Sequence, residues 1–160
     1  MKAITIRQPW AQMIAWGWKR FETRSYRPLS AMDAIQPGAR TLAIHAGGSW
    51  NSTTRAFCNM IPTRAAEIRG EDPDDYRLDP AGLEIQYPPG VIVATAVLGR
   101  VLKIGRDLPG EITALEHFLG DYDPGRYAWE LTDIRELEEP IPAKGRLGIW
   151  DWSPPEGFSR

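Results

Sequence analysis

Three short groups of polar and aromatic residues near the N-terminus have the residue types best suited to ligand chemistry. Within eighteen positions the chain places Gln8-Pro9-Trp10, Gly17-Trp18-Lys19 and Glu22-Thr23-Arg24-Ser25. Residues 19–27 contain four basic side chains and one acidic side chain, a local net charge of +3. A segment of that charge attracts anions, and the free N–H groups of a helix starting near Trp10 would add to the attraction. The segment therefore predicts a local site for an anionic ligand.

The Glu22 and Arg24 pair also suits a nucleobase. A carboxylate accepts hydrogen bonds from an exocyclic amino group, while a guanidinium group donates to a phosphate or carbonyl oxygen. Trp10, in the same cluster, offers a flat surface for stacking. Alternatively, the pair is a salt bridge on the surface of a sheet, where it would contribute less than about 1 kcal/mol to stability. The sequence leaves both interpretations open.

Two further places add candidate ligand-binding residues. The run Lys144-Gly145-Arg146 is a basic turn before the last predicted strand, although basic surface turns are common. A histidine at position 45 could act as a general base or donate to a base edge, but a lone histidine on a strand more often makes a structural hydrogen bond. The predicted ligand-binding residues are Gln8, Trp10, Lys19, Glu22, Arg24, Ser25, His45, Lys144 and Arg146.

Metal and cofactor motifs are absent from the sequence. Acidic and histidine side chains gather late in the chain, at Glu116, His117, Asp121 and Asp123, but their spacing matches no established metal site. The sequence contains no glycine-rich phosphate loop, nucleophile elbow or HExxH segment. We therefore predict no metal and no cofactor.

The elements expected to position these residues are short strands and helices without a regular alternation. Periodicity predicts strands at 3–6, 21–25, 41–45, 91–104, 127–137 and 147–152, and helices at 10–16, 53–60, 63–69 and 112–119. In the second strand, Arg20, Glu22 and Arg24 would share one face. This order favours an α+β fold with a curled, mostly antiparallel sheet over a doubly wound sheet.

Length and composition are those of one globular domain. The chain has 160 residues, of which 42% are hydrophobic and 25% charged, so we expect a single domain over 1–160. Residues 71–89 form an acidic, proline-containing segment, with six acidic residues and one arginine between Glu71 and Glu84. We expect a loop-like insert there, which is a possible docking segment for a protein partner.

Charge and cysteine content limit the function and location. A net charge of −2 argues against a protein that coats nucleic acid through bulk charge, so any such binding must be local. The single cysteine, Cys58, cannot form an internal disulfide. The longest nearly apolar stretch is residues 91–99, far short of a membrane span, and the N-terminus lacks the apolar region of a signal peptide. We expect a cytoplasmic protein without a membrane partner.

Several motifs, in the same order along the chain, resemble the ASCH-domain family, a branch of the PUA-like superfamily. The residues that carry the resemblance are 6–11 (IRQPWA), 17–25 (GWKRFETRS), 42–46 (LAIHA), 90–94 (GVIVA) and 142–150 (PAKGRLGIW). The sequence looks most like the ASCH domain of the transcription coactivator called activating signal cointegrator. The resemblance implies a small mixed or antiparallel β-barrel with short helices around its mouth. It also implies a cleft in which the Gln-Pro-Trp helix faces the Lys-x-x-Glu-x-Arg strand.

The resemblance implies two kinds of function. Family members are thought to bind RNA or other nucleic acid, and some are hydrolases: an amidohydrolase acting on N4-acetylcytidine and a ribonuclease acting on single-stranded RNA. In the amidohydrolase type a lysine, a threonine and a later glutamate do the chemistry; Lys19 matches the lysine, but Glu22 stands at the threonine position. We therefore expect a cationic cleft that binds RNA, a nucleotide or a modified nucleoside. The alternative is a hydrolase with Lys19 and Glu22 as catalytic residues.

Overall fold

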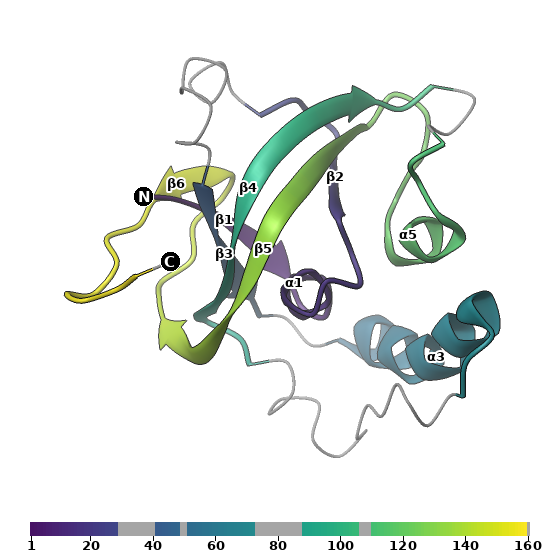
Figure 1. The fold of residues 1–160 in the computed structure, drawn as a ribbon, viewed down its shortest axis with the longest axis horizontal. Coiled ribbons are helices and arrows are strands. Elements are labelled where there is room, and N and C mark those ends of the chain that lie inside the picture. Colours follow the sequence, from purple (N-terminus) through teal and green to yellow (C-terminus); the bar gives the residue numbers. More distant parts are fainter. Residues whose placement is uncertain (29–40, 49–50, 73–87, 106–109, 160) are drawn as a thin grey trace.

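The computed structural model of the chain describes residues 1–28, 41–48, 51–72, 88–105 and 110–159. In chain order its elements are β1 (Lys2–Arg7), α1 (Trp10–Ala15), β2 (Phe21–Arg24), β3 (Thr41–Gly47), α3 (Ser52–Arg69), β4 (Val91–Lys103), α5 (Ala114–Leu119), β5 (Tyr127–Pro142) and β6 (Ile149–Asp151) (Figure 1).

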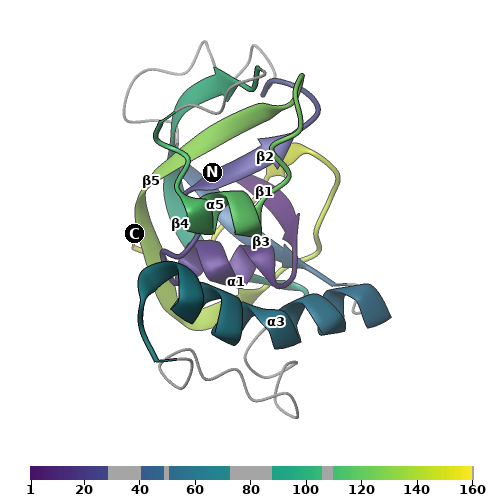
Figure 2. The same ribbon diagram turned by 90° about the vertical axis from the view of Figure 1, so that its right-hand side faces the viewer.

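The strands form one curled, mixed sheet. Its order is β2-β5-β4-β3-β1-β6; β1 and β3 are parallel and the other neighbours are antiparallel. The pairing of β4 with β5 shifts register at three places, and such irregularities bend a sheet and increase its twist. The result is a half-barrel, and Figure 2 shows α1, α3 and α5 gathered on one side of it. The predicted α+β class is confirmed, and β4 lies in the middle of the sheet order.

Helix α1 lies at the centre because it is buried on both sides. Ala11 and Ile14 pack into the main core with residues of the sheet, including Trp129. Met13 points into a second core that holds Cys58 of α3 and Leu115 of α5. Burial of apolar surface on two sides stabilises a helix of only six residues, which would be marginal alone. This packing fixes Trp10 at the start of α1 and the turn after α1 that leads to Lys19.

The two helices expected at 53–60 and 63–69 form one continuous helix, α3, with Pro62 inside it. The prediction of a break was wrong because the neighbours of Pro62 are buried: Ile61 and Ala65 are fully enclosed in the second core. The ends carry the expected signals, since the Asn51 side chain accepts a 2.8 Å hydrogen bond from the Thr54 N–H, and Gly70 caps the C-terminus with φ of 71°.

Other sequence predictions differ from the structure mainly in length. Strand β5 continues to Pro142 instead of ending near 137, because it pairs with β4 as far as Val91. Most of the predicted acidic insert at 71–89 lies outside the described residues. No helix in the described part of the chain is long and apolar enough to cross a membrane.

Candidate functional site

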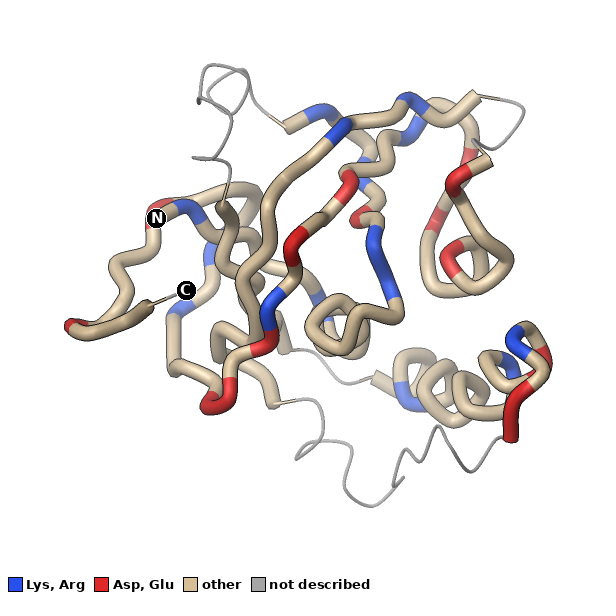
Figure 3. The backbone as a smooth tube through the Cα atoms, viewed as in Figure 1, with Lys and Arg blue, Asp and Glu red and all other residues tan. Residues whose placement is uncertain are grey.

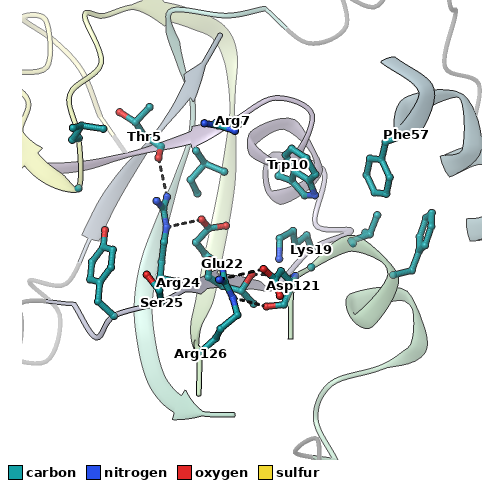
Figure 4. Close-up of a pocket in the computed structure, with 18 of the residues that line it drawn as sticks. Thr5, Arg7, Trp10, Lys19, Glu22, Arg24, Ser25, Phe57, Asp121 and Arg126 are labelled. Atoms are coloured by element: carbon teal, nitrogen blue, oxygen red, sulfur yellow. Dashed lines mark hydrogen bonds and ion pairs between the residues drawn. The ribbon is translucent and has the colours of Figure 1, made fainter. Parts of the chain in front are cut away.

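A cavity of about 700 Å³ opens between β1, β2, the start of α1, the end of α5 and the turn before β6 (Figure 4). Predicted site residues that line it are Trp10, Lys19, Glu22, Arg24, Ser25 and Arg146. Its other polar or charged lining side chains are Thr5, Arg7, Thr23, Tyr26, Asp121 and Arg126. The curl of the sheet brings β2 and β1 together here, although three strands separate them in the sheet order.

Arg24 connects these two strands across the cavity. Its Nη2 donates a 2.9 Å hydrogen bond to the Thr5 carbonyl oxygen, and its Nε lies 2.8 Å from Oε1 of Glu22 (Figure 4). The contact with Glu22 is an ion pair without hydrogen-bond geometry, so the buried Nε makes no hydrogen bond within the described part of the chain. Glu22 is itself 8% exposed. A directional donor and a carboxylate are thus held side by side at the cavity wall.

Lys19 follows α1 and is buried, with 1% of its surface exposed. Its Nζ donates a hydrogen bond to the Phe21 carbonyl oxygen and lies 5.8 Å from the centre of the Tyr122 ring. Burial lowers the pKa of the Lys19 amino group, and the negative charges of Glu22 and Glu116 oppose that effect. The Lys19 amino group therefore differs chemically from an exposed lysine.

Glu116 approaches the same place from α5. It is buried, accepts a hydrogen bond from the Arg20 backbone N–H, and accepts a 3.0 Å hydrogen bond from the Tyr122 hydroxyl. Burial and the adjacent Glu116 raise the pKa of Tyr122, so its hydroxyl stays protonated and remains a donor. Glu116 thus fixes the turn that carries Lys19. In the sequence, Glu116 was noted only as one of four residues whose spacing matches no metal site. Among the residues that the structure describes, no group of three or more potential metal ligands occurs.

Opposite charges are also paired at the α5 end of the cavity. Arg126 Nη1 lies 3.2 Å from Asp121 Oδ2, and Arg126 Nε donates to the Asp121 carbonyl oxygen at 3.1 Å. The lining as a whole has five basic and two acidic side chains, a formal net charge of +3. Charged residues of both signs occur along the rest of the backbone (Figure 3), so this basic excess is local.

An aromatic wall closes the side facing α3. The Trp10 ring stacks on Phe57 with centroids 5.5 Å apart, and Phe57 contacts Phe118 of α5 at 5.4 Å. All three side chains line the cavity. One face of Trp10 is therefore occupied by Phe57. Trp18, the other tryptophan of the predicted cluster, packs on Trp16 and does not line the cavity.

Comparison with solved structures identifies the architecture. The crystal structure of ASCH from Zymomonas mobilis superposes with a TM-score of 0.54 over 95% of this chain and 87% of that chain, at 15% sequence identity. This chain has the ASCH fold. A structure of a mutant ZmASCH protein from the same organism covers 88% of this chain and 72% of that chain, with 16% identity and a TM-score of 0.44. No protein-family model and no curated protein matches the sequence.

Three predicted site residues do not line the cavity of this ASCH fold. Gln8 is buried at the start of α1, where its Oε1 accepts from the Gln12 N–H at 3.1 Å and its Nε2 donates to the Pro88 carbonyl oxygen at 3.2 Å. The hydrogen bond from Gln12 uses one of the free N–H groups at the start of α1 that were expected to attract an anion. Lys144 is exposed and lies outside the cavity lining.

His45 has the structural role that the sequence kept as its alternative. Its Nε2 lies 3.0 Å from the Ala143 carbonyl oxygen, and burial lowers the pKa of the ring. The backbone of Gly145 packs directly against the imidazole. His45 therefore holds the segment that carries Arg146, rather than contacting the cavity itself.

The residues that the sequence missed come from distant parts of the chain. Arg7 ends β1, while Asp121 and Arg126 flank the turn before β5. Of the predicted +3 segment at 19–27, Arg20 and Arg27 do not line the cavity, and Arg20 lies 3.4 Å from Glu130. Only the curl of the sheet brings the distant residues together. The IRQPW segment, which contains Arg7 and carries part of the family resemblance, is the one signal in the sequence for that arginine.

Proposed function

We propose that this ASCH-fold chain binds RNA or a nucleotide in the cavity. The observation that carries the proposal is the charge of the lining: five basic against two acidic side chains in a molecule whose net charge is −2. A phosphate-bearing ligand is attracted by such a local excess. The volume of about 700 Å³ is within the usual range for a small-ligand pocket.

Glu22 and Arg24 support recognition of a base. The Glu22 carboxylate accepts hydrogen bonds, and the Arg24 guanidinium, which lies 2.8 Å from it, is a hydrogen-bond donor. An amino group next to a carbonyl group, as on a nucleobase edge, would satisfy both side chains.

A titration with single-stranded RNA tests this function. We expect the Arg24→Ala variant to bind at least about tenfold more weakly, a loss of about 1.4 kcal/mol, and wild-type binding to weaken with salt. Arg64→Ala is the matched control, because Arg64 is an exposed arginine of α3 that pairs with Glu67 and does not line the cavity. Equal affinities of the two variants, or no wild-type binding to RNA or nucleotides, would contradict the proposal.

Arg24 also connects β1 and β2, so its removal could affect folding. Glu22→Gln provides the second test because it keeps the shape of the side chain while removing its charge. We expect Glu22→Gln to change the relative affinities for oligonucleotides of different base composition. Circular dichroism and thermal unfolding of both variants separate a binding loss from a folding loss.

A hydrolase acting on a modified nucleoside or on single-stranded RNA is the second candidate, and one observation favours it. The buried Lys19 has a lowered pKa, which is the condition for a lysine to serve as a base or nucleophile. We expect Glu22 to be its partner carboxylate. Incubation with N4-acetylcytidine and with single-stranded RNA tests this candidate: turnover must occur and must disappear in Lys19→Met.

A further inference from the structure

Two arginines at the cavity mouth differ from those inside it. Arg24 and Arg126 are each paired with a carboxylate, whereas Arg7 and Arg146 are exposed and have no ion-pair partner in the ranges that the structure describes. They belong to neighbouring segments: β1 runs antiparallel to β6, and the Thr5 hydroxyl donates a 2.8 Å hydrogen bond to the Arg146 carbonyl oxygen. Of the three basic lining residues outside these ion pairs, Arg7 and Arg146 are thus at the mouth, and the third, Lys19, is buried.

An exposed apolar side chain stands beside these arginines. Leu147 lines the cavity and is 99% exposed, the largest value among the large hydrophobic residues described. The segment that carries it is well anchored: Thr5 contacts Arg146, and His45 contacts Ala143. Tyr26, which also lines the cavity, is 41% exposed, and its carbonyl oxygen accepts a 3.2 Å hydrogen bond from Trp129. A structured rim that presents apolar and aromatic surface to solvent provides contacts for bases outside the cavity.

The placement of ion pairs inside the cavity and of exposed arginines at its mouth favours a nucleic-acid strand over a single nucleotide as the ligand. Inside the cavity, the Glu22/Arg24 and Arg126/Asp121 pairs offer hydrogen bonds with nearly balanced charge, which suits a base. One phosphate group needs only one of the two unpaired arginines. A chain of nucleotides supplies a phosphate on either side of the inserted base and neighbouring bases for the rim.

We propose that the ligand is a single-stranded nucleic acid that inserts one nucleotide into the cavity. Its flanking phosphates bind Arg7 and Arg146, and an adjacent base packs on Leu147. This inference rests on the proposed function and adds to it that a free nucleoside or mononucleotide is a poor ligand. Arg7 and Arg146 supply affinity without sequence preference, whereas Glu22 and Arg24 read the inserted base.

The salt dependence of binding separates these roles. Each phosphate contact to a single strand contributes about −0.7 to the slope of log K against log salt concentration. We therefore expect Arg7→Gln and Arg146→Gln each to make the slope shallower by about 0.7 and to weaken binding of all sequences alike. Glu22→Gln keeps the arginine contacts at the mouth and should change base preference with little change in slope.

The experiment is a fluorescence-anisotropy titration of the full chain with mixed-sequence heptamers of RNA and DNA, at several salt concentrations, with nucleoside 5′-monophosphates as competitors. We expect a heptamer to bind at least about tenfold more tightly than any monophosphate. The two strand types show whether ribose is required, and tight binding of either supports the inference. Leu147→Ser should weaken binding of the heptamer but not of the monophosphates. Arg64→Gln, which removes a charge outside the cavity, should leave the slope of log K against log salt concentration unchanged.

The outcomes distinguish the inference from the function on which it rests. If monophosphates bind as tightly as heptamers, or if Arg7→Gln and Arg146→Gln keep the wild-type slope, the strand inference is wrong while nucleotide binding stands. If neither heptamers nor monophosphates bind the wild-type chain, the proposed function fails, and the inference fails with it.

Discussion

Lys19 has an unusual environment for a charged residue. Its side chain is almost completely buried, and a backbone carbonyl oxygen, two carboxylates and an aromatic ring surround its amino group. Glu22 and Glu116 partly offset the cost of burying the charge, but burial has the larger effect on the pKa. Such an arrangement lowers stability and is typical of a functional position.

Lys19→Met gives a prediction for the pH dependence of stability. Because the pKa of Lys19 falls below its usual 10.5 on folding, the unfolded chain binds more protons at this residue between the lowered pKa and 10.5. The wild-type free energy of unfolding therefore rises with pH across that window, by about 1.4 kcal/mol for each unit of lowering. We expect the stability of Lys19→Met relative to wild type to decrease as pH rises towards 10.5.

Urea unfolding of both proteins at a series of alkaline pH values measures this difference. Lys103→Met, at an exposed lysine of β4, is the control for removal of a charge. A stability difference for Lys19→Met that is independent of pH would show that the amino group is as easily protonated in the folded chain as in the unfolded one.

Single residues show where sequence reasoning succeeds and where it fails. Glu22 and Arg24 were predicted to share a face because strand alternation places residues two apart on the same side. Gln8 was given a ligand role because it adjoins Trp10, yet its amide groups are used by the backbone of α1 and by Pro88. Residue type and spacing indicate which interactions a side chain can make. Whether backbone groups already use its hydrogen-bonding capacity depends on the folded chain.

The segment before β6 is the element that presents Arg146 and Leu147. It is fixed by the close approach of Gly145 to the buried His45 ring: a Cβ atom at position 145 would lie 2.7 Å from Nδ1. Gly145→Ala therefore forces the segment or the ring to move. We expect a loss of about 1–3 kcal/mol in the free energy of unfolding, together with weaker binding of the RNA heptamer.

Gly105→Ala is the matched control, because a Cβ atom there meets no neighbour within 4 Å among the residues that the structure describes. Chemical denaturation and anisotropy of both variants check this prediction. Equal stabilities would mean that the His45 contact does not restrain the segment.

Helix α3 shows how packing overrides a local break signal. Pro62 lacks the N–H group that would complete a helical hydrogen bond, and it remains inside the helix because its neighbours are buried. We expect Pro62→Ala to restore that hydrogen bond and to raise the free energy of unfolding by about 1–3 kcal/mol. Thermal unfolding measures the change, with the adjacent exposed Thr63→Ala as control, and a lower melting temperature for Pro62→Ala would contradict the account.

At the scale of elements, the sequence predicted what is local and missed what is distant. Strands β1 to β4 follow from alternation and β-branched residues, and their approximate positions were predicted. The length of β5 depends on its pairing with β4, and the continuity of α3 depends on the second core. Neither interaction is visible in a short window of sequence.

For the whole molecule, curling of the sheet is what creates the site. Strands β2 and β1 are separated by three strands in the sheet order, yet Arg24 of one donates to Thr5 of the other. The same curl collects Arg7, Arg126 and Arg146 around the residues of the predicted cluster. Of the five basic residues of the lining, the sequence singled out Lys19, Arg24 and Arg146, whereas Arg7 and Arg126 were not predicted.

The most direct test of the central claim is an NMR titration of the ¹⁵N-labelled chain with a single-stranded RNA heptamer. We expect the largest shifts at the side-chain Nε–H of Arg24 and at the backbone amides of Thr5 and Gly148, because all three residues line the cavity. The amide of Arg64, on α3 outside the lining, should stay unchanged. Shifts that are absent from the cavity residues, or that lie on other surfaces of the molecule, would contradict the account.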